Sequence, residues 1–185
     1  MKIAIVVGVS ATEGLGAAVA RKFSANGLHV VVAGRTSERL EEVVKQITGL
    51  GGKASAFEVD ATDSGELEKL MAFADSQGEV VSVVYNVGNN QPIAFTDLTE
   101  ELFEQFWRVC TLAGFLTAKA ALPLLEKSGG SLLFTGASAS LRGRPGFAHF
   151  GAAKAGLRNL AQAIAKDYGP RGVHVGHVVV DGVIN

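Results

Sequence analysis

An unbroken apolar run meets a cluster of glycines in the stretch Ile3-Ala4-Ile5-Val6-Val7-Gly8-Val9-Ser10-Ala11-Thr12-Glu13-Gly14-Leu15-Gly16. The run Ile3–Val7 consists largely of β-branched residues, which predicts a strand buried on both faces. The residues from Gly14 to Ala25 predict a helix directly after it. A glycine-rich turn at this place leaves backbone N–H groups free at a helix N-terminus, where they favour a phosphate group. The stretch therefore predicts the start of an α/β domain that binds a nucleotide.

The alternation of apolar runs and helical patterns continues along the chain. Further strands are predicted at His29–Ala33, Ala54–Val59, Val80–Tyr85, Ser131–Thr135 and Val173–Val180. Helices are predicted around Leu40–Ile47, from Thr99 to about Lys127, and from Ala148 to about Tyr168. Another helix is predicted to start after Asp63, which can cap it while Glu66 reaches back. Six apolar strands that alternate with helices indicate a parallel sheet with helices on both faces. We therefore expect residues 1–185 to form a single Rossmann-type, doubly wound α/β domain with strand order 3-2-1-4-5-6.

Composition argues against several classes of protein. The 185 residues include 17 Lys plus Arg against 18 Asp plus Glu, so there is no basic excess for binding nucleic acid. The single cysteine, Cys110, rules out a disulfide framework and a cysteine-based metal site, and it fits a reducing cytoplasm. No apolar run reaches about 18 residues, and the start of the chain does not match a signal peptide. We therefore expect a cytoplasmic protein with neither a nucleic-acid nor a membrane partner.

The end of the second predicted strand bears on which dinucleotide is bound. In such a domain an acidic residue here binds the ribose 2′-OH of NAD, whereas an arginine accommodates the 2′-phosphate of NADP. The strand ends Val32-Ala33-Gly34-Arg35, with no carboxylate in this position. Alternatively, Arg35 is a solvated loop residue, and Glu13 in the glycine loop is an argument against NADP. The missing carboxylate favours NADP as the cofactor, and NAD stays possible.

Three motifs together resemble the short-chain dehydrogenase/reductase family, and the resemblance covers the entire chain. That family carries Thr-Gly-x-x-x-Gly-x-Gly in the first loop; this chain has Val7-Gly8 and then Gly14-x-Gly16, a loop two residues longer that lacks the threonine. Val59-Asp60-Ala61-Thr62-Asp63 looks like the family's Asp-Val motif at the adenine, and Tyr85-Asn86-Val87-Gly88 is similar to its Asn-Asn-Ala-Gly motif beside the cofactor. The resemblance implies these cofactor-binding residues: Gly8, Ser10, Gly14, Leu15, Gly16, Arg35, Asp60, Ala61, Asn86, Val87, Gly88 and Lys154.

The resemblance also implies hydride transfer between a nicotinamide and a carbonyl or alcohol. In the family a tyrosine is the acid, and a lysine four residues later lowers the pKa of its hydroxyl. Here the Tyr-x-x-x-Lys box reads Phe150-Gly151-Ala152-Ala153-Lys154, so the lysine is present and the phenol is absent. Ala137 stands at the family's serine position with Ser138 beside it, and Cys110 stands at its asparagine position. Lys154 and Ser138 remain as the candidate catalytic residues.

Other polar residues near these motifs have structural explanations. His149 adjoins Phe150 but points about 100° away from it on a helix, which favours a helix N-terminal residue without a catalytic part. Cys110 lies in an apolar helix and is expected to be a small core residue. His174 and His177 fall on opposite faces of the sixth strand, so they do not form a metal pair and we expect no metal.

Two functions stay open on the sequence alone. The first is an NADP(H)-linked oxidoreductase with an atypical or impaired active site, and the second is a catalytically silent dinucleotide-binding sensor or scaffold. Val180-Asp181-Gly182-Val183 stands where family members have Pro-Gly, and we expect the family's substrate lid and seventh strand to be missing, so the substrate is open too. The resemblance also implies a homodimer or homotetramer formed through two long helices, and the small residues within Phe150–Tyr168 would permit close helix packing.

Overall fold

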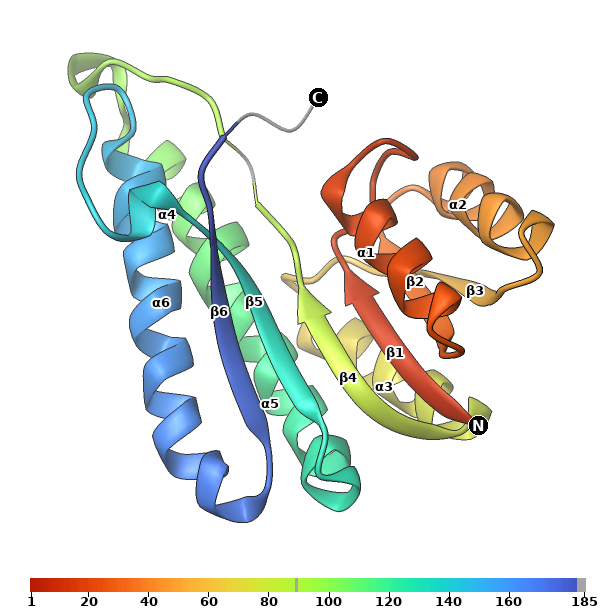
Figure 1. The fold of residues 1–185 in the computed structure, drawn as a ribbon. Helices are drawn as coiled ribbons and strands as arrows, with labels where there is room; N and C mark the ends of the chain where they lie inside the picture. Colours follow the sequence, from red (N-terminus) through yellow and green to blue (C-terminus); the bar gives the residue numbers. More distant parts are fainter. Residues whose placement is uncertain (89, 183–185) are drawn as a thin grey trace.

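The computed structural model describes residues 1–88 and 90–182 and confirms a parallel sheet of six strands (Figure 1). The strands are β1 (Lys2–Val7), β2 (His29–Gly34), β3 (Lys53–Glu58), β4 (Glu79–Tyr85), β5 (Ser131–Ala137) and β6 (His174–Val180). Their order in the sheet is β3-β2-β1-β4-β5-β6, as the sequence predicts. The strand order reverses between β1 and β4, and folds of this kind bind their ligands at the carboxyl ends of the strands near that point.

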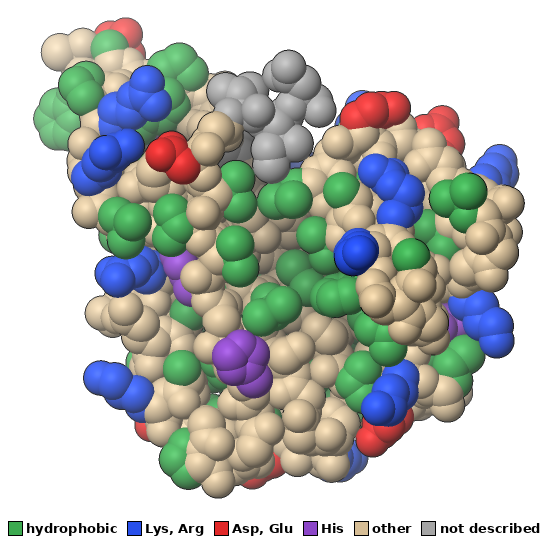
Figure 2. All heavy atoms as spheres, in the orientation of Figure 1, with side chains coloured by type: hydrophobic (Ala, Val, Ile, Leu, Met, Phe, Trp, Pro, Cys, Tyr) green, Lys and Arg blue, Asp and Glu red, His purple; other side chains and the backbone are tan. Residues whose placement is uncertain are grey.

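Helices cover both faces of the sheet. They are α1 (Leu15–Ala25), α2 (Ser37–Gly49), α3 (Ser64–Gln77), α4 (Glu100–Trp107), α5 (Ala113–Ser128) and α6 (Ala148–Tyr168), with short 3₁₀ turns η1 (Phe95–Asp97), η3 (Ser138–Ser140) and η4 (Gly169–Arg171). The helices α1 and α2 pack on the near face of Figure 1, and α3, α5 and α6 pack on the far face. Figure 2 shows hydrophobic side chains in the middle of the near face, with charged side chains mainly round its rim.

The first strand shows why an apolar run without alternation forms an inner strand. The side chains of Ile3–Val7 have no exposed surface. Ile3, Ile5 and Val7 pack into the core on the side of α3 and α5, while Val6 packs with residues of α1 and α2. Because helices cover both faces of β1, every position after Lys2 is buried, and a polar alternation would leave unpaired groups in the core.

One predicted helix is interrupted. The sequence predicts an unbroken helix from Thr99 to about Lys127, but a π-helical turn, η2 (Arg108–Leu112), separates α4 from α5. The Tyr85 hydroxyl donates a hydrogen bond to the Val109 carbonyl, and the Thr111 hydroxyl donates to the Ala153 carbonyl at 2.7 Å. These contacts tie the widened turn to β4 and α6, and the apolar spacing of the helix does not reveal them.

The start of α3 follows the predicted cap in part. The Asp63 side chain accepts a hydrogen bond from the Glu66 N–H at 3.0 Å, as predicted. The Glu66 carboxylate, however, accepts from the Asp60 N–H at 2.7 Å and does not reach back to Asp63. The Asp63 N–H is already used, because it donates to the Asp60 carbonyl at 3.0 Å. Together these bonds fix the turn that carries Asp60 at the carboxyl end of β3.

The expectation that no apolar stretch is long enough to cross a membrane needs a correction. The helical run Glu100–Ser128, 29 residues through α4, η2 and α5, is long and apolar enough to do so by length and composition. Its α5 part places Ala113, Ala121 and Leu125 in the main core of the protein. Core helices of this length meet the same criteria, so packing against the sheet accounts for its apolar composition.

Candidate functional site

Glycines allow three segments of the chain to meet at the carboxyl end of β1. Gly8 has a φ of +97°, and a Cβ there would lie 2.7–2.8 Å from backbone atoms of Asn86 and Val87. A Cβ on Gly16 would lie 2.8 Å from the Gly8 carbonyl oxygen, which accepts a hydrogen bond from the Asn86 side-chain amide at 3.0 Å. Because no side chain fits at either position, the glycines let the first loop, the start of α1 and the end of β4 pack closely together.

A cavity of about 510 Å³ opens beside this loop at the ends of β1 to β4. The structure brings the following predicted cofactor residues together on its walls: Gly8, Ser10, Arg35, Asp60, Ala61, Asn86, Val87 and Gly88. The polar lining residues that no motif predicted as cofactor-binding are Thr36, Arg39 and Thr62. Gly14 and Gly16 are not on these walls, and Leu15 lines a neighbouring cavity instead.

The surroundings of Gly34, the last residue of β2, explain why no acidic residue stands there. A Cβ at this position would lie 2.4 Å from the Val9 carbonyl oxygen, which leaves no room for a side chain. The next side chain, Arg35, lines the cavity, and Arg39 in the first turn of α2 lines it as well. Arg35 precedes the extended N-cap residue Thr36, so the meeting of the two arginines on one wall follows from the turn between β2 and α2 and not from helical spacing.

The electrostatics of this cavity favour an anionic ligand. Asp60 is the one carboxylate among the described residues that line it. Hydrogen bonds from the Thr62 N–H at 2.9 Å and hydroxyl at 2.8 Å, together with the charge of Arg35, lower the pKa of Asp60. With two arginines against one carboxylate, the lining residues carry one net positive charge.

A second cavity, of about 400 Å³, continues from Asn86–Gly88 to the carboxyl ends of β5 and β6. Lys154 lines it from α6, with 4% of its surface exposed. Its ammonium group donates to the Thr135 carbonyl at 3.0 Å and to the Val87 carbonyl at 3.3 Å. Burial lowers the pKa of Lys154. This lysine therefore links α6 to the ends of β4 and β5, next to the predicted cofactor residues.

Phe150 lies one helical turn before Lys154, and the lysine nitrogen is 5.8 Å from the centroid of its ring. The ring is 6% exposed and packs with Cys110 and Ala153 in a small apolar cluster. Cys110 is fully buried there and lines neither cavity, so the expectation of a small core residue is confirmed. An apolar ring and a buried thiol thus occupy the positions at which the family resemblance implies a phenol and an amide.

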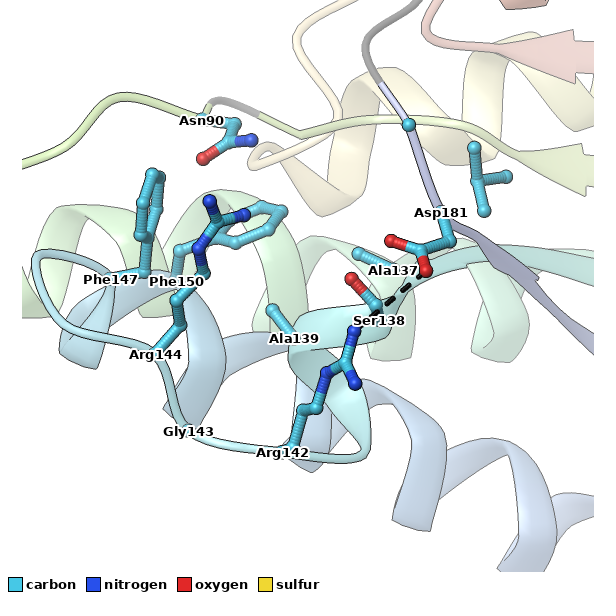
Figure 3. Close-up of a pocket in the computed structure, with 12 residues that line it drawn as sticks. Asn90, Ala137, Ser138, Ala139, Arg142, Gly143, Arg144, Phe147, Phe150 and Asp181 are labelled. Carbon is cyan, nitrogen blue, oxygen red and sulfur yellow. Dashed lines mark ion pairs between the residues drawn. The ribbon is translucent and has the colours of Figure 1, made fainter.

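Ser138 lies on a third cavity, of about 400 Å³, beside Phe150 (Figure 3). Ala137 and Phe150 line both this cavity and the one at Lys154, so Ser138 and Lys154 face adjoining spaces. The nearby Ser140 is buried and donates its one hydroxyl proton to the Ala137 carbonyl at 2.5 Å. Several other residues on this cavity were not predicted as site residues: Asn90, Ala139, Gly143, Arg144 and Phe147.

The histidines lie outside these walls. His149 is 1% exposed, and its ring packs on Phe106 with centroids 4.1 Å apart. Its Nε2 lies 3.2 Å from the Gln91 carbonyl oxygen, so this nitrogen carries the proton and donates it. Burial and the charges of Lys154 and Arg158 lower the pKa of His177, which packs against Gly136. Among the described residues there is no cluster of three metal-ligating side chains.

Known proteins share this sequence pattern. A family model described as short chain dehydrogenase matches residues 2–184. The 2,5-dichloro-2,5-cyclohexadiene-1,4-diol dehydrogenase LinX of Sphingobium indicum is 32% identical over 184 residues, which make up 98% of this chain and 73% of that protein. The uncharacterized oxidoreductase YxbG of Bacillus subtilis is 28% identical over 182 residues, 96% of this chain and 65% of that protein.

Solved structures share the fold. A short-chain dehydrogenase from Rhodopseudomonas palustris has a TM-score of 0.90 at 34% identity, over 96% of this chain and 83% of that one. A putative short-chain dehydrogenase/reductase from Burkholderia xenovorans has a TM-score of 0.93 at 27% identity, over 98% of this chain and 74% of that one. The chain spans 63–65% of the length of YxbG and of the human dehydrogenase/reductase SDR family member 4.

Proposed function

This chain belongs to the short-chain dehydrogenase family, and we propose that it is an NADP(H)-linked oxidoreductase that interconverts a carbonyl and an alcohol with an impaired proton donor. The observation that carries this proposal is the row of adjoining cavities along the carboxyl ends of the strands. The first has the arginine pair, the second has Lys154, and the third has Ser138, with Phe150 on the wall between the last two.

The residues along this edge fit a dinucleotide. Gly8 and Gly16 allow the loop after β1 to pack closely on Asn86 and Val87, and we assign the pyrophosphate to the Gly14–Gly16 segment at the start of α1. The guanidinium groups of Arg35 and Arg39 suit a 2′-phosphate. When bound, the nicotinamide supplies or accepts the hydride, and Lys154 is the residue we assign to the nicotinamide ribose.

Protonation of the substrate oxygen is the weak step in this proposal. A hydride that reaches a carbonyl carbon leaves an alkoxide, which needs a proton or a stabilising charge within the site. Phe150 has no proton to give. Ser138 would donate a hydrogen bond to the substrate oxygen, and the positive charge of Lys154 would stabilise the developing negative charge. Since a serine hydroxyl is a weak acid near neutral pH, we propose that turnover is slower than with a phenol.

Titration with the two reduced cofactors tests the assignment of NADP. We expect tighter binding of NADPH than of NADH, because the arginine pair meets an additional phosphate. Arg35→Ala and Arg39→Ala should each weaken NADPH binding by about tenfold and change NADH binding little. Lys45→Ala, on an exposed position of the same helix α2, removes the same charge and should leave both affinities unchanged. A preference for NADH, or equal losses in the Lys45 variant, would refute the assignment.

Turnover separates an oxidoreductase from a silent binding protein. Full-length protein would be assayed with NADPH against a panel of aldehydes and ketones, with calorimetric titration of the cofactor in parallel. Slow but measurable NADPH oxidation that depends on the carbonyl compound supports the proposal. Tight cofactor binding without any turnover across the panel would instead select the sensor or scaffold.

We also propose that the protein self-associates and is located in the cytoplasm. Phe103, Trp107 and Phe115 on α4 and α5 are 41–43% exposed, which is typical of side chains that a partner covers. A second copy of the chain, packed through these helices and α6, is the partner we propose. The single buried cysteine, Cys110, suits a reducing compartment.

A further inference from the structure

The cavity beside Phe150 combines apolar walls with charged side chains (Figure 3). Its apolar side chains are those of Ala137, Ala139, Phe147, Phe150 and Val180. Its charged side chains are Arg142 and Arg144, from the loop between η3 and α6, and Asp181, which follows β6. A cavity of this kind suits a small molecule with an apolar body and one charged end.

The two arginines differ in their partners. Arg142 has a nitrogen 3.8 Å from a carboxylate oxygen of Asp181. Among the described residues no carboxylate lies within 4.0 Å of the Arg144 guanidinium. Figure 3 shows Arg142 pointing toward Asp181 and Arg144 extending toward Asn90. Within the described part of the chain, the cavity therefore carries one positive charge without a carboxylate at close range.

Arg144 is held on a defined turn and not on a loose loop. The segment Arg144-Pro145-Gly146-Phe147 closes with a hydrogen bond from the Phe147 N–H to the Arg144 carbonyl at 3.1 Å, and Gly146 has a φ of +77°. Proline followed by a glycine of positive φ is the pattern of a type II turn. The Gly146 carbonyl accepts from the Ile93 N–H at 2.9 Å, and the Arg144 guanidinium carbon lies 5.5 Å from the Phe147 ring centroid. The turn thus fixes the backbone of Arg144 at the mouth of the cavity, and its guanidinium group lies near the Phe147 ring.

We propose that the substrate is a carboxylate-bearing carbonyl compound, or the corresponding hydroxy acid, and that Arg144 binds its carboxylate. This inference rests on the oxidoreductase function proposed above. The apolar body of the substrate would lie along Phe147 and Phe150, which places its carbonyl group toward Ser138 and Lys154. A guanidinium group matches a carboxylate with two parallel hydrogen bonds, and one uncompensated positive charge balances a single negative charge.

Binding to matched acids and amides tests this inference without any need for turnover. The probes are 4-acetylbenzoate and 4-acetylbenzamide, which have the same ring and ketone and differ in the charged end. Each is titrated calorimetrically into the full-length protein saturated with NADP⁺. We expect the acid to bind about five- to tenfold more tightly than the amide, because Arg144 is exposed and solvent weakens its pairing. The preference should shrink at 0.5 M salt.

Variants assign the preference to one arginine. Arg144→Gln should bring the affinities for acid and amide to within about twofold, and Arg144→Lys should keep part of the difference. Arg142→Gln is the matched control, because it removes the same charge from the same loop but from a side chain that faces Asp181. It should keep most of the preference for the acid. Because Arg144 is exposed, we expect these variants to fold like the parent protein, and unchanged melting temperatures would verify this.

Three outcomes overturn the inference: equal binding of acid and amide by the parent protein, an unchanged preference in Arg144→Gln, or an equal loss in Arg142→Gln. Failure of the proposed oxidoreductase function gives a different result. If the acid binds through Arg144 but its ketone is not reduced by NADPH, the carboxylate site stands and the catalytic proposal fails. If ketones are reduced without preference for acids, the catalytic proposal stands and the carboxylate site fails.

Discussion

Phe150→Tyr places a phenol on a wall shared by the cavities of Lys154 and Ser138. Phe150 borders both spaces, so we expect an added hydroxyl to reach into one of them. The lysine nitrogen is already 5.8 Å from the ring centroid, close enough for its charge to act on the new group. We expect this variant to gain NADPH-dependent reduction of ketones, and Phe150→Tyr combined with Ala137→Ser to gain more.

The size of the gain follows from the change in acidity and from what a positioned acid contributes. A positive charge at this range lowers a phenol pKa by about 1–3 units from its usual value near 10, toward neutral pH. General acid catalysis is worth about 10² to 10⁴ in rate, which is about 3–5 kcal/mol of barrier. Cys110 still replaces the asparagine of the family pattern. We therefore expect the single variant near the lower limit, about 100-fold in kcat/KM.

The assay is steady-state oxidation of NADPH against a panel of aldehydes, ketones and oxo acids, at equal cofactor saturation. Phe147→Tyr is the matched control, because it adds the same hydroxyl to another ring on the same cavity, with glycine instead of lysine four residues later. Adding Lys154→Met to Phe150→Tyr should abolish most of the gain. A parent protein that reduces simple ketones as fast as the variant, or an equal gain in Phe147→Tyr, would refute the reasoning.

Gly34→Ala should lower the melting temperature and weaken NADPH binding, because the new Cβ would lie 2.4 Å from the Val9 carbonyl oxygen. Gly49→Ala is the control and should do neither, because the space around Gly49 is open. The free energy of unfolding should fall as the pH drops below 6.5, because burial lowers the native pKa of His177 and the unfolded chain then binds more protons. His177→Gln should reduce this slope in denaturant titrations between about pH 5 and 7. Light scattering at micromolar concentration should show an oligomer that Phe115→Ser shifts toward the monomer; a strict monomer in the parent protein would end that proposal.

The sheet could be predicted from the sequence because its signals are local and repeated. Ile3–Val7 is apolar at every position, and its burial follows from helices on both faces. The end of each such strand then lies at one edge of the sheet, so Gly8, Asp60 and Asn86 meet there although they are far apart in the chain. The sheet topology brings these residues together, which is why motif spacing identified eight of the residues that line this cavity.

The remaining features depend on contacts between distant segments, which no local pattern encodes. The π-helical turn at Arg108–Leu112 is tied to Tyr85 at the end of β4. The Arg144 turn is tied to the backbone of Ile93 through the Gly146 carbonyl. In the sequence Arg144 is one more polar loop residue, and the role that we propose for it rests on its place beside Phe147 and Phe150 on the same cavity.

The hydrogen-bond donors of Lys154 determine whether Lys154 or Ser138 can bind the substrate oxygen in the proposed reaction. An ammonium group has three N–H donors, and two of them go to the Thr135 and Val87 carbonyls. These bonds link β4, β5 and α6 whether or not a phenol stands at position 150, so the presence of the lysine is explained without catalysis. One donor is left for a ligand. If it goes to the nicotinamide ribose, Lys154 acts on the substrate oxygen through its charge alone, and the hydrogen bond to that oxygen falls to Ser138.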